Sequence, residues 1–187
     1  PRLQKQFPKP FKSISLDDFY RVLNRVQPSL IRTESDEVTY NLHIIIRFEI
    51  EKGLIEGRIR VKDLPEVWKA KIKEYLGIKV PNDRVGVLQD VHWSSGAIGY
   101  FPTYALGNLY AAQFYHAAQK QIPDLEKQMK KGNFTPLREW LRNNIHAPGK
   151  TYTSDELIKK VSGESLQTGY FVEYLTQKFG GIYKLIK

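Results

Sequence analysis

Cysteine is absent from this sequence, and methionine occurs only once among its 187 residues. Without cysteine the chain can form neither a disulfide framework nor a thiolate metal site, so a cytoplasmic protein is expected. Long hydrophobic runs are also missing, since the strongest candidate, residues 44–46, is flanked by His43 and Arg47. A bilayer span needs roughly 20 apolar residues, so no membrane partner is predicted, and no signal peptide is visible. The chain begins at Pro1, which predicts a fragment or a processed product.

The composition is that of a globular domain with an excess of basic residues. A hydrophobic content of 41% and a charged content of 26% predict a single module over residues 1–187 with a sizeable core. The net charge of +9 suggests nucleic acid, but the basic residues are scattered, and their densest group, at 127–131, adjoins Asp124 and Glu126. No zinc-finger or RNA-recognition signature occurs. We therefore expect no nucleic-acid partner, and a non-catalytic, basic, all-α binding module is kept only as the alternative function.

Helix caps and helix breakers predict an all-α fold almost throughout. Ser15 and Thr153 each begin a capping-box pattern, Asp63 followed by Pro65 begins a helix, and Gly77 is placed to end it. The predicted helices span 15–27, 29–52, 64–76, 104–121, 124–131, 135–144 and 168–179, with a further helix after Thr153 and with Gly180 and Gly181 closing the last. A short extended piece is predicted at 58–61, and residues 78–102 form an irregular block.

Polar residues form a stripe along the predicted helix 29–52. At 100° per residue, one narrow sector holds Arg32, Asp36, Tyr40, His43 and Arg47, while apolar residues occupy two other sides. A helix that is apolar on two sides is largely buried, so its polar stripe faces a cleft or a paired network. In a cleft, Arg32 would offer its planar fork of donors to a carboxylate, with Asp36 holding the fork in place. The alternative is a solvated face with one weak Arg32–Asp36 ion pair.

The irregular block is unusually aromatic and poor in charge. Long irregular connections in compact domains are usually functional, and this composition is not that of a disordered segment. Gly86, Gln89, Asp90, His92 and Trp93 form the pattern G-x-x-Q-D-x-H-W. This pattern closely resembles the signature of the zinc carboxypeptidases known as the thermostable carboxypeptidase 1 family.

A second motif supports the resemblance. Residues 31–36, Ile-Arg-Thr-Glu-Ser-Asp, are similar to the family's I/R-x-x-A/G-D pattern, with Ser35 where alanine or glycine is usual. Segments 140–146 and 163–166 also resemble the C-terminal part of the family. The resemblance covers nearly the whole chain and implies the C-terminal helical portion of a larger, mainly helical, two-lobed peptidase with a deep cleft.

The family's metal-binding motif is missing. H-E-x-x-H places two histidines one helical turn apart on the metal and uses the glutamate to activate water, but no two of the four histidines here stand four apart. The resemblance therefore implies that zinc, or cobalt in its place, is bound by an upstream part of the complete enzyme. No metal ligand is assigned in this chain, which alone is expected to be inactive. Family members are commonly homodimers.

The resemblance and the residue chemistry assign candidate roles. Peptide cleavage builds negative charge on the former carbonyl oxygen, and donors aimed at that oxygen lower the barrier. His92, Tyr100 and Tyr104 are the catalytic candidates, whereas Trp93 and Phe101 are expected to pack. The substrate-binding candidates are Arg32, Asp36, Gln89 and Asp90, of which Gln89 and Asp90 are expected to orient His92. The predicted function is the C-terminal segment of a metallocarboxypeptidase that releases single residues from peptide C-termini.

Overall fold

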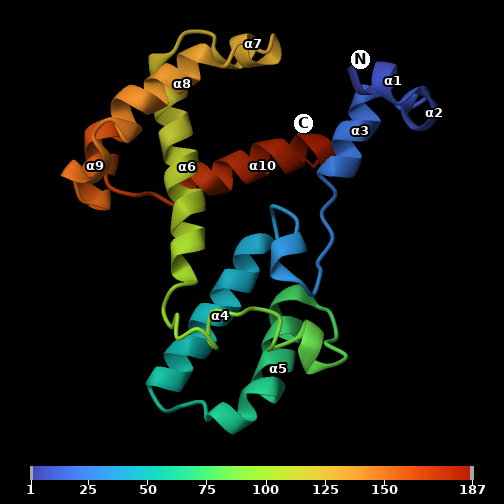
Figure 1. The fold of residues 1–187 in the computed structure, drawn as a ribbon, viewed down its shortest axis with the longest axis vertical. Coiled ribbons are helices and arrows are strands. Elements are labelled where there is room, and N and C mark those ends of the chain that lie inside the picture. Colours follow the sequence, from blue (N-terminus) through green and yellow to red (C-terminus); the bar gives the residue numbers. More distant parts are fainter. Residues whose placement is uncertain (1, 186–187) are drawn as a thin grey trace. The chain divides into compact units, whose positions relative to one another are not determined.

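The computed structural model describes residues 2–185 and confirms the all-α prediction, since no strand occurs among them (Figure 1). The chain divides into two compact units, residues 1–102 and residues 103–187. The sequence predicts that both units act together as a single module, and this stays a prediction. No helix within residues 2–185 combines the length and apolar character that crossing a bilayer requires.

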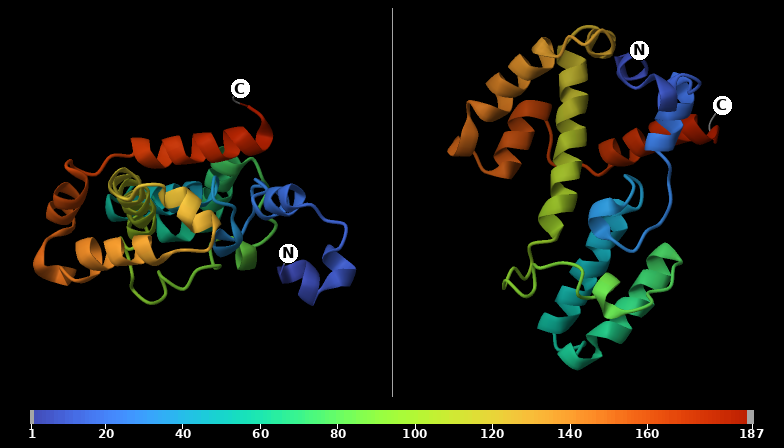
Figure 2. Two further views of the ribbon diagram at one scale, coloured as in Figure 1. Left: turned by 90° about the horizontal axis from the view of Figure 1, so that it is seen from above. Right: turned by 45° about the vertical axis from the view of Figure 1, so that its right-hand side comes forward.

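Among residues 2–185, helices α1 to α5 belong to the first unit, and α6, which begins at its last residue, leads into the second unit with α7 to α10 (Figures 1 and 2). The first unit contains α1 (Arg2–Gln6), α2 (Pro8–Phe11), α3 (Leu16–Leu23), α4 (Tyr40–Ile55) and α5 (Leu64–Leu76), with 3-10 turns η1 (Arg32–Glu34), η2 (Val61–Asp63) and η3 (Asp83–Val85). The second contains α6 (Pro102–Gln121), α7 (Leu125–Lys130), α8 (Thr135–Leu141), the π-helical segment η4 (Arg142–His146), the 3-10 turn η5 (Gly149–Thr151), α9 (Ser154–Ser162) and α10 (Gly169–Tyr183).

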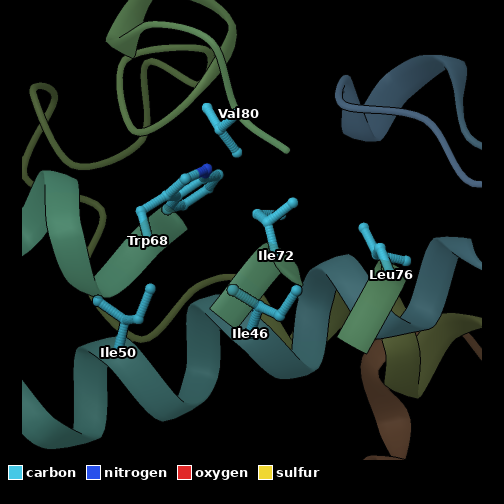
Figure 3. Close-up of a cluster of buried hydrophobic side chains, with 6 residues drawn as sticks. All are labelled: Ile46, Ile50, Trp68, Ile72, Leu76 and Val80. Atoms are coloured by element: carbon cyan, nitrogen blue, oxygen red, sulfur yellow. The ribbon is translucent and has the colours of Figure 1, made fainter. Parts of the chain in front are cut away.

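The core of the first unit lies between α4 and α5, which pack side by side (Figure 3). Ile46 and Ile50 of α4 meet Trp68 and Ile72 of α5, and all four are almost completely buried. Isoleucines four apart lie on the same face of a helix, so the apolar sequence pattern directly creates this contact. The contact fixes α4 in space, and with it the adjacent face that carries His43, Arg47 and Glu51.

The core of the second unit is formed around α6. Ala117 and Ala118 of α6 pack with Leu125, Trp140 of α8 and Val161 of α9. Small residues on α6 let the neighbouring helices approach closely, and the Trp140 indole N–H donates to the Gln121 side-chain oxygen at 2.8 Å. The buried tryptophan thus satisfies its one donor inside the core.

Several helix ends are where the caps predict them. The Ser15 hydroxyl accepts from the Asp18 backbone N–H, and Thr153 forms a complete capping box with Glu156. Gly77 ends α5 in the left-handed region, with φ of 72°. The block predicted as irregular, 78–102, contains only the η3 turn before α6 begins at Pro102.

The continuous helix predicted over 29–52 is wrong. Only η1 forms within residues 30–38, Ser35 is extended, and α4 begins at Tyr40. The Asp36 carboxylate accepts from the backbone N–H groups of Val38 and Thr39, which offers these donors a partner outside a helix. Arg32 and Asp36 therefore do not share a helix face with His43 and Arg47.

Three smaller predictions also need correction. The helix from residue 15 ends at Leu23 rather than 27, and α10 continues through Gly180 and Gly181 to Tyr183. Neither glycine has the positive φ that would end a helix. The extended piece predicted at 58–61 includes Arg60, which is extended, but Val61 already begins η2. Gly53 lies inside α4, where a Cβ would stand 2.5 Å from the Ile59 side chain.

Candidate functional site

Two arginines converge on one carboxylate in the first unit. Arg32 donates from Nε and Nη2 to the two oxygens of Asp90 at 3.2 and 2.8 Å, forming a bidentate pair. Arg47, on α4, contacts Asp90 Oδ2 from Nε at 2.8 Å and from Nη2 at 2.6 Å. The Tyr40 hydroxyl accepts from Arg32 Nη1 at 3.1 Å. We call Arg32, Arg47 and Asp90 the arginine cluster.

The arginine cluster is buried and carries two positive charges against one negative charge. Arg47 is 0% exposed and Arg32 6% exposed. Burial lowers the pKa of Arg47 to about 10, because the charge of Asp90 only partly offsets the loss of solvent. Burial also opposes the charge on Asp90, but the hydrogen bond from Arg32 and the charge of Arg47 outweigh it and hold the pKa of Asp90 below its usual range.

Aromatic rings surround the two guanidinium groups. Arg47 lies over the Trp68 ring at 4.7 Å and over the Phe101 ring at 5.2 Å, and Arg32 lies 5.7 Å from Phe101. Cations attract the faces of aromatic rings, and this attraction strengthens away from water. The rings therefore form an apolar, low-dielectric surface against the guanidinium groups of Arg32 and Arg47, and they help to hold these two like charges close together.

Gln89 ties the arginine cluster to the chain around it. Its side-chain oxygen accepts from the Arg32 backbone N–H and from Arg47 Nη2, both at 3.0 Å. Its amide nitrogen donates to the carbonyl of Leu30 at 2.9 Å and to that of Gly86 at 3.2 Å. Gly86 must be small, because a Cβ there would lie 3.0 Å from the Asn82 carbonyl oxygen. Gly86 and Gln89 of the motif thus both maintain the local backbone structure beside the arginine cluster.

His92 lies at the edge of the arginine cluster. Its ring packs against Phe101 at 4.4 Å and stacks on Tyr100 at 5.9 Å between centroids. Nδ1 is 3.9 Å from Asp90 Oδ1. The structure therefore brings His92, Tyr100 and Asp90 together, as the sequence predicted. Gln89 contacts the two arginines, and its expected role in orienting His92 stays a prediction.

Asp36, a predicted substrate-binding residue, makes hydrogen bonds within its own part of the chain. Asp36 accepts from its own segment, including the Thr39 hydroxyl at 2.7 Å and the Gln27 backbone N–H at 3.1 Å. Asp90 holds the Arg32 fork in the place predicted for Asp36. Tyr104 is half-buried in the first turn of α6, in the second unit, and its role in the site stays a prediction.

Sequence reasoning missed one buried polar contact, between Glu51 and Trp93. The Trp93 indole N–H donates to Glu51 Oε1 at 2.7 Å, and Trp93 packs edge-on against Phe101 and Trp68. Glu51 follows Arg47 by four residues, so it extends the face of α4 that holds His43 and Arg47. That spacing was the available signal. Trp93 and Phe101 pack as predicted, with Phe101 1% exposed.

The described residues do not fit a catalytic metal site. Among residues 2–185, no group of three histidine, cysteine, aspartate or glutamate side chains is arranged to hold a metal ion. The only carboxylate in the arginine cluster is already shared by two guanidinium groups. Buried arginines are suited to carboxylates and phosphates, and here both guanidinium groups are paired with the carboxylate of Asp90.

The first unit is thus an all-α structure that buries two arginines beside a histidine on an aromatic, irregular segment. The chain belongs to the carboxypeptidase Taq (M32) metallopeptidase family, whose model matches residues 1–179. The resemblance that the two motifs predicted is thereby confirmed.

Individual relatives give the same result. The chain is 45% identical over 184 residues to Carboxypeptidase 1 of Bacillus subtilis, covering 98% of this chain and 37% of that protein. It is 44% identical to Thermostable carboxypeptidase 1 of Thermus thermophilus, covering 98% of this chain and 36% of that protein. The crystal structure of the M32 carboxypeptidase from Deinococcus radiodurans superposes with a TM-score of 0.95 at 41% identity, over 98% of this chain and 37% of that one.

The chain thus spans little more than a third of these relatives. Family membership implies a metal cofactor and hydrolysis of peptides by the longer proteins. The matches support the peptidase prediction and give no support to the nucleic-acid alternative.

Proposed function

We propose that this chain is the substrate-recognition segment of a metallocarboxypeptidase that releases single residues from peptide C-termini. The observation that carries the proposal is the arginine cluster, in which Arg32 and Arg47 share the single carboxylate of Asp90. An exopeptidase must distinguish a chain end from a chain interior, and the end differs by one negative charge. A cluster with one excess positive charge suits that difference.

Arg32 is the residue we assign to the substrate carboxylate. Arg47 is completely enclosed, whereas Arg32 and its partner Asp90 keep some exposure, so an incoming ligand meets Arg32 first. Asp90 and Tyr40 fix the plane of its guanidinium, which lowers the entropy lost when a ligand binds. Gln89 and Asp36 act as positioning residues, through the Arg32 backbone and the turn before α4.

His92 and Tyr100 are the proposed catalytic donors from the first unit. Their rings stack beside Asp90, on the same irregular segment, and each carries a donor able to stabilise a developing oxyanion. Asp90 joins the two parts of the site, because it contacts Arg32 and lies near His92. Tyr104 is proposed as a further donor, contributed by the second unit.

The metal, which we propose to be zinc or cobalt, is assigned to a part of the enzyme outside this chain. When bound, it would supply the Lewis acidity that peptide hydrolysis uses. The partners of the chain are then peptide substrates and the upstream part of the same enzyme. A homodimer and a cytoplasmic location complete the proposal, and they rest on the family resemblance and on the absence of cysteine.

The function is tested by expressing the chain together with the upstream part and digesting an unblocked peptide. Mass spectrometry should show products shortened one residue at a time from the C-terminus. Internal cleavage, or no cleavage at all by a metal-loaded preparation, would contradict the proposal. Salt-sensitive retention of the isolated chain on DNA, together with inactivity of the joined chains, would favour the alternative binding module.

A further inference from the structure

The first helices of the chain form an apolar groove that no described residue fills. The groove encloses about 700 Å³ and is lined mainly by Leu3, Phe11, Ile14, Leu16 and Phe19. The Gln4 side chain donates to the carbonyls of Phe11 and Ile14, which holds α1 against the segment before α3. Phe11 and Phe19 pack edge to face at 5.8 Å. These contacts give the groove a defined conformation.

These helices bury nothing of their own. None of the described residues in α1, α2 or α3 is buried, and Leu16, in the first turn of α3, is 76% exposed. Helices of this length are unstable in water unless an apolar face packs against something. A concave, contiguous apolar surface on a folded protein marks an interaction site.

The segment that forms the groove is basic, and Arg2 lines the groove itself. Residues 2–25 contain six basic side chains against two acidic ones, whereas residues 26–102 contain eleven of each. The excess positive charge of the first unit is therefore confined to the segment that forms the groove. One of the two acidic residues, Asp18, is engaged in the helix cap with Ser15.

We infer that this groove binds an acidic amphipathic helix from the part of the enzyme outside this chain. The inference rests on the proposed function, in which the chain is one segment of a longer peptidase. The relative from Bacillus subtilis has room for such a helix, because this chain covers only 37% of it. Apolar side chains of the helix would fill the groove while its carboxylates meet the basic side chains of the segment that forms it.

Charge and shape disfavour other occupants. A second copy of the chain would bring the same basic segment and be repelled by it. A nucleic acid would neutralise the basic side chains of this segment but would leave the apolar lining of the groove uncovered. A lipid surface takes up a protruding apolar face, whereas this one is concave.

Co-expression with the unmatched part of the Bacillus subtilis relative tests the inference. The tagged 187-residue chain should capture that part, and Leu16→Asp should weaken the captured complex at least about tenfold, since it places a charge in the apolar interface. Val22→Asp is the matched control, because Val22 is on the same helix and 72% exposed but does not line the groove. Binding to it should stay within about twofold.

Three outcomes would overturn the inference. They are no capture by the wild-type chain, equal capture by the Leu16→Asp chain, and transfer of the chain to vesicles of phosphatidylserine and phosphatidylcholine that Leu16→Asp abolishes while capture persists. Circular dichroism of both variants shows that the helices remain. A complex that forms through the groove but cleaves no peptide would refute the proposed function alone, so the two failures are distinguishable.

Discussion

Replacement of Asp90 by asparagine should destabilise the first unit strongly. Asparagine keeps the shape and one acceptor oxygen but leaves Arg32 and Arg47, both almost without solvent contact, without their shared counter-charge. Removal of one partner from a buried ion pair costs about 3–5 kcal/mol, and the retained acceptor favours the lower end, about 3 kcal/mol. For a unit of this size, that loss lowers the melting temperature by about 12–24 °C.

Urea unfolding followed by tryptophan fluorescence measures this loss in the first unit. In a Trp140→Phe background the remaining tryptophans, Trp68 and Trp93, both report on that unit. Asp63→Asn is the matched control, since it breaks an exposed pair with Arg60 and should leave the unfolding midpoint almost unchanged. If the free energy of unfolding of Asp90→Asn lies within about 0.5 kcal/mol of the parent's, the two buried arginines do not depend on the charge of Asp90.

Three further changes have distinct signatures. Burial, aided by Arg47, lowers the pKa of His43 to about 4; because the unfolded chain protonates first, near pH 6.5, stability should fall between about pH 6.5 and 4 by about 3 kcal/mol, and urea titrations of His43→Gln should lack this loss. His92→Ala in the complete enzyme should reduce kcat about a hundredfold with full metal content, and metal loss in this variant would recast His92 as a ligand. Thr153→Ala removes the capping box of α9 and should cost about 1 kcal/mol by thermal unfolding, with no change in catalysis.

Local signals predicted much of the fold and the membership of the site. The caps at Ser15, Gly77 and Thr153 depend on side chains within four residues of the helix end, so sequence alone locates them. The two motifs predicted that Arg32 and Asp90 belong to one site, although 58 positions separate them.

Pairing within the site was beyond local reasoning. Helical periodicity placed Asp36 beside Arg32. The Asp36 carboxylate instead accepts from the backbone of its own segment, and the continuous helix that this prediction assumed does not form. Asp90 was assigned to His92, and only the packing of α4 against the irregular segment shows that two arginines hold it. Glu51 could have been found by extending the polar face of α4 by one more turn.

We propose that Arg32 recognises the free carboxylate of a peptide. The enzyme's preference for a peptide with a free C-terminal acid over the same peptide with a C-terminal amide is the sharpest test of this role. In the complete enzyme, kcat/KM should be measured for a peptide and for its C-terminal amide. Arg32→Ala should reduce the preference for the free acid at least tenfold, corresponding to about 1.4 kcal/mol. Arg32→Lys should keep it only in part, because lysine retains the charge but not the planar guanidinium that Asp90 and Tyr40 hold in place. Arg60→Ala, an exposed arginine paired only with Asp63 among the described ion pairs, should keep the full preference. Full preference in Arg32→Ala would contradict the account.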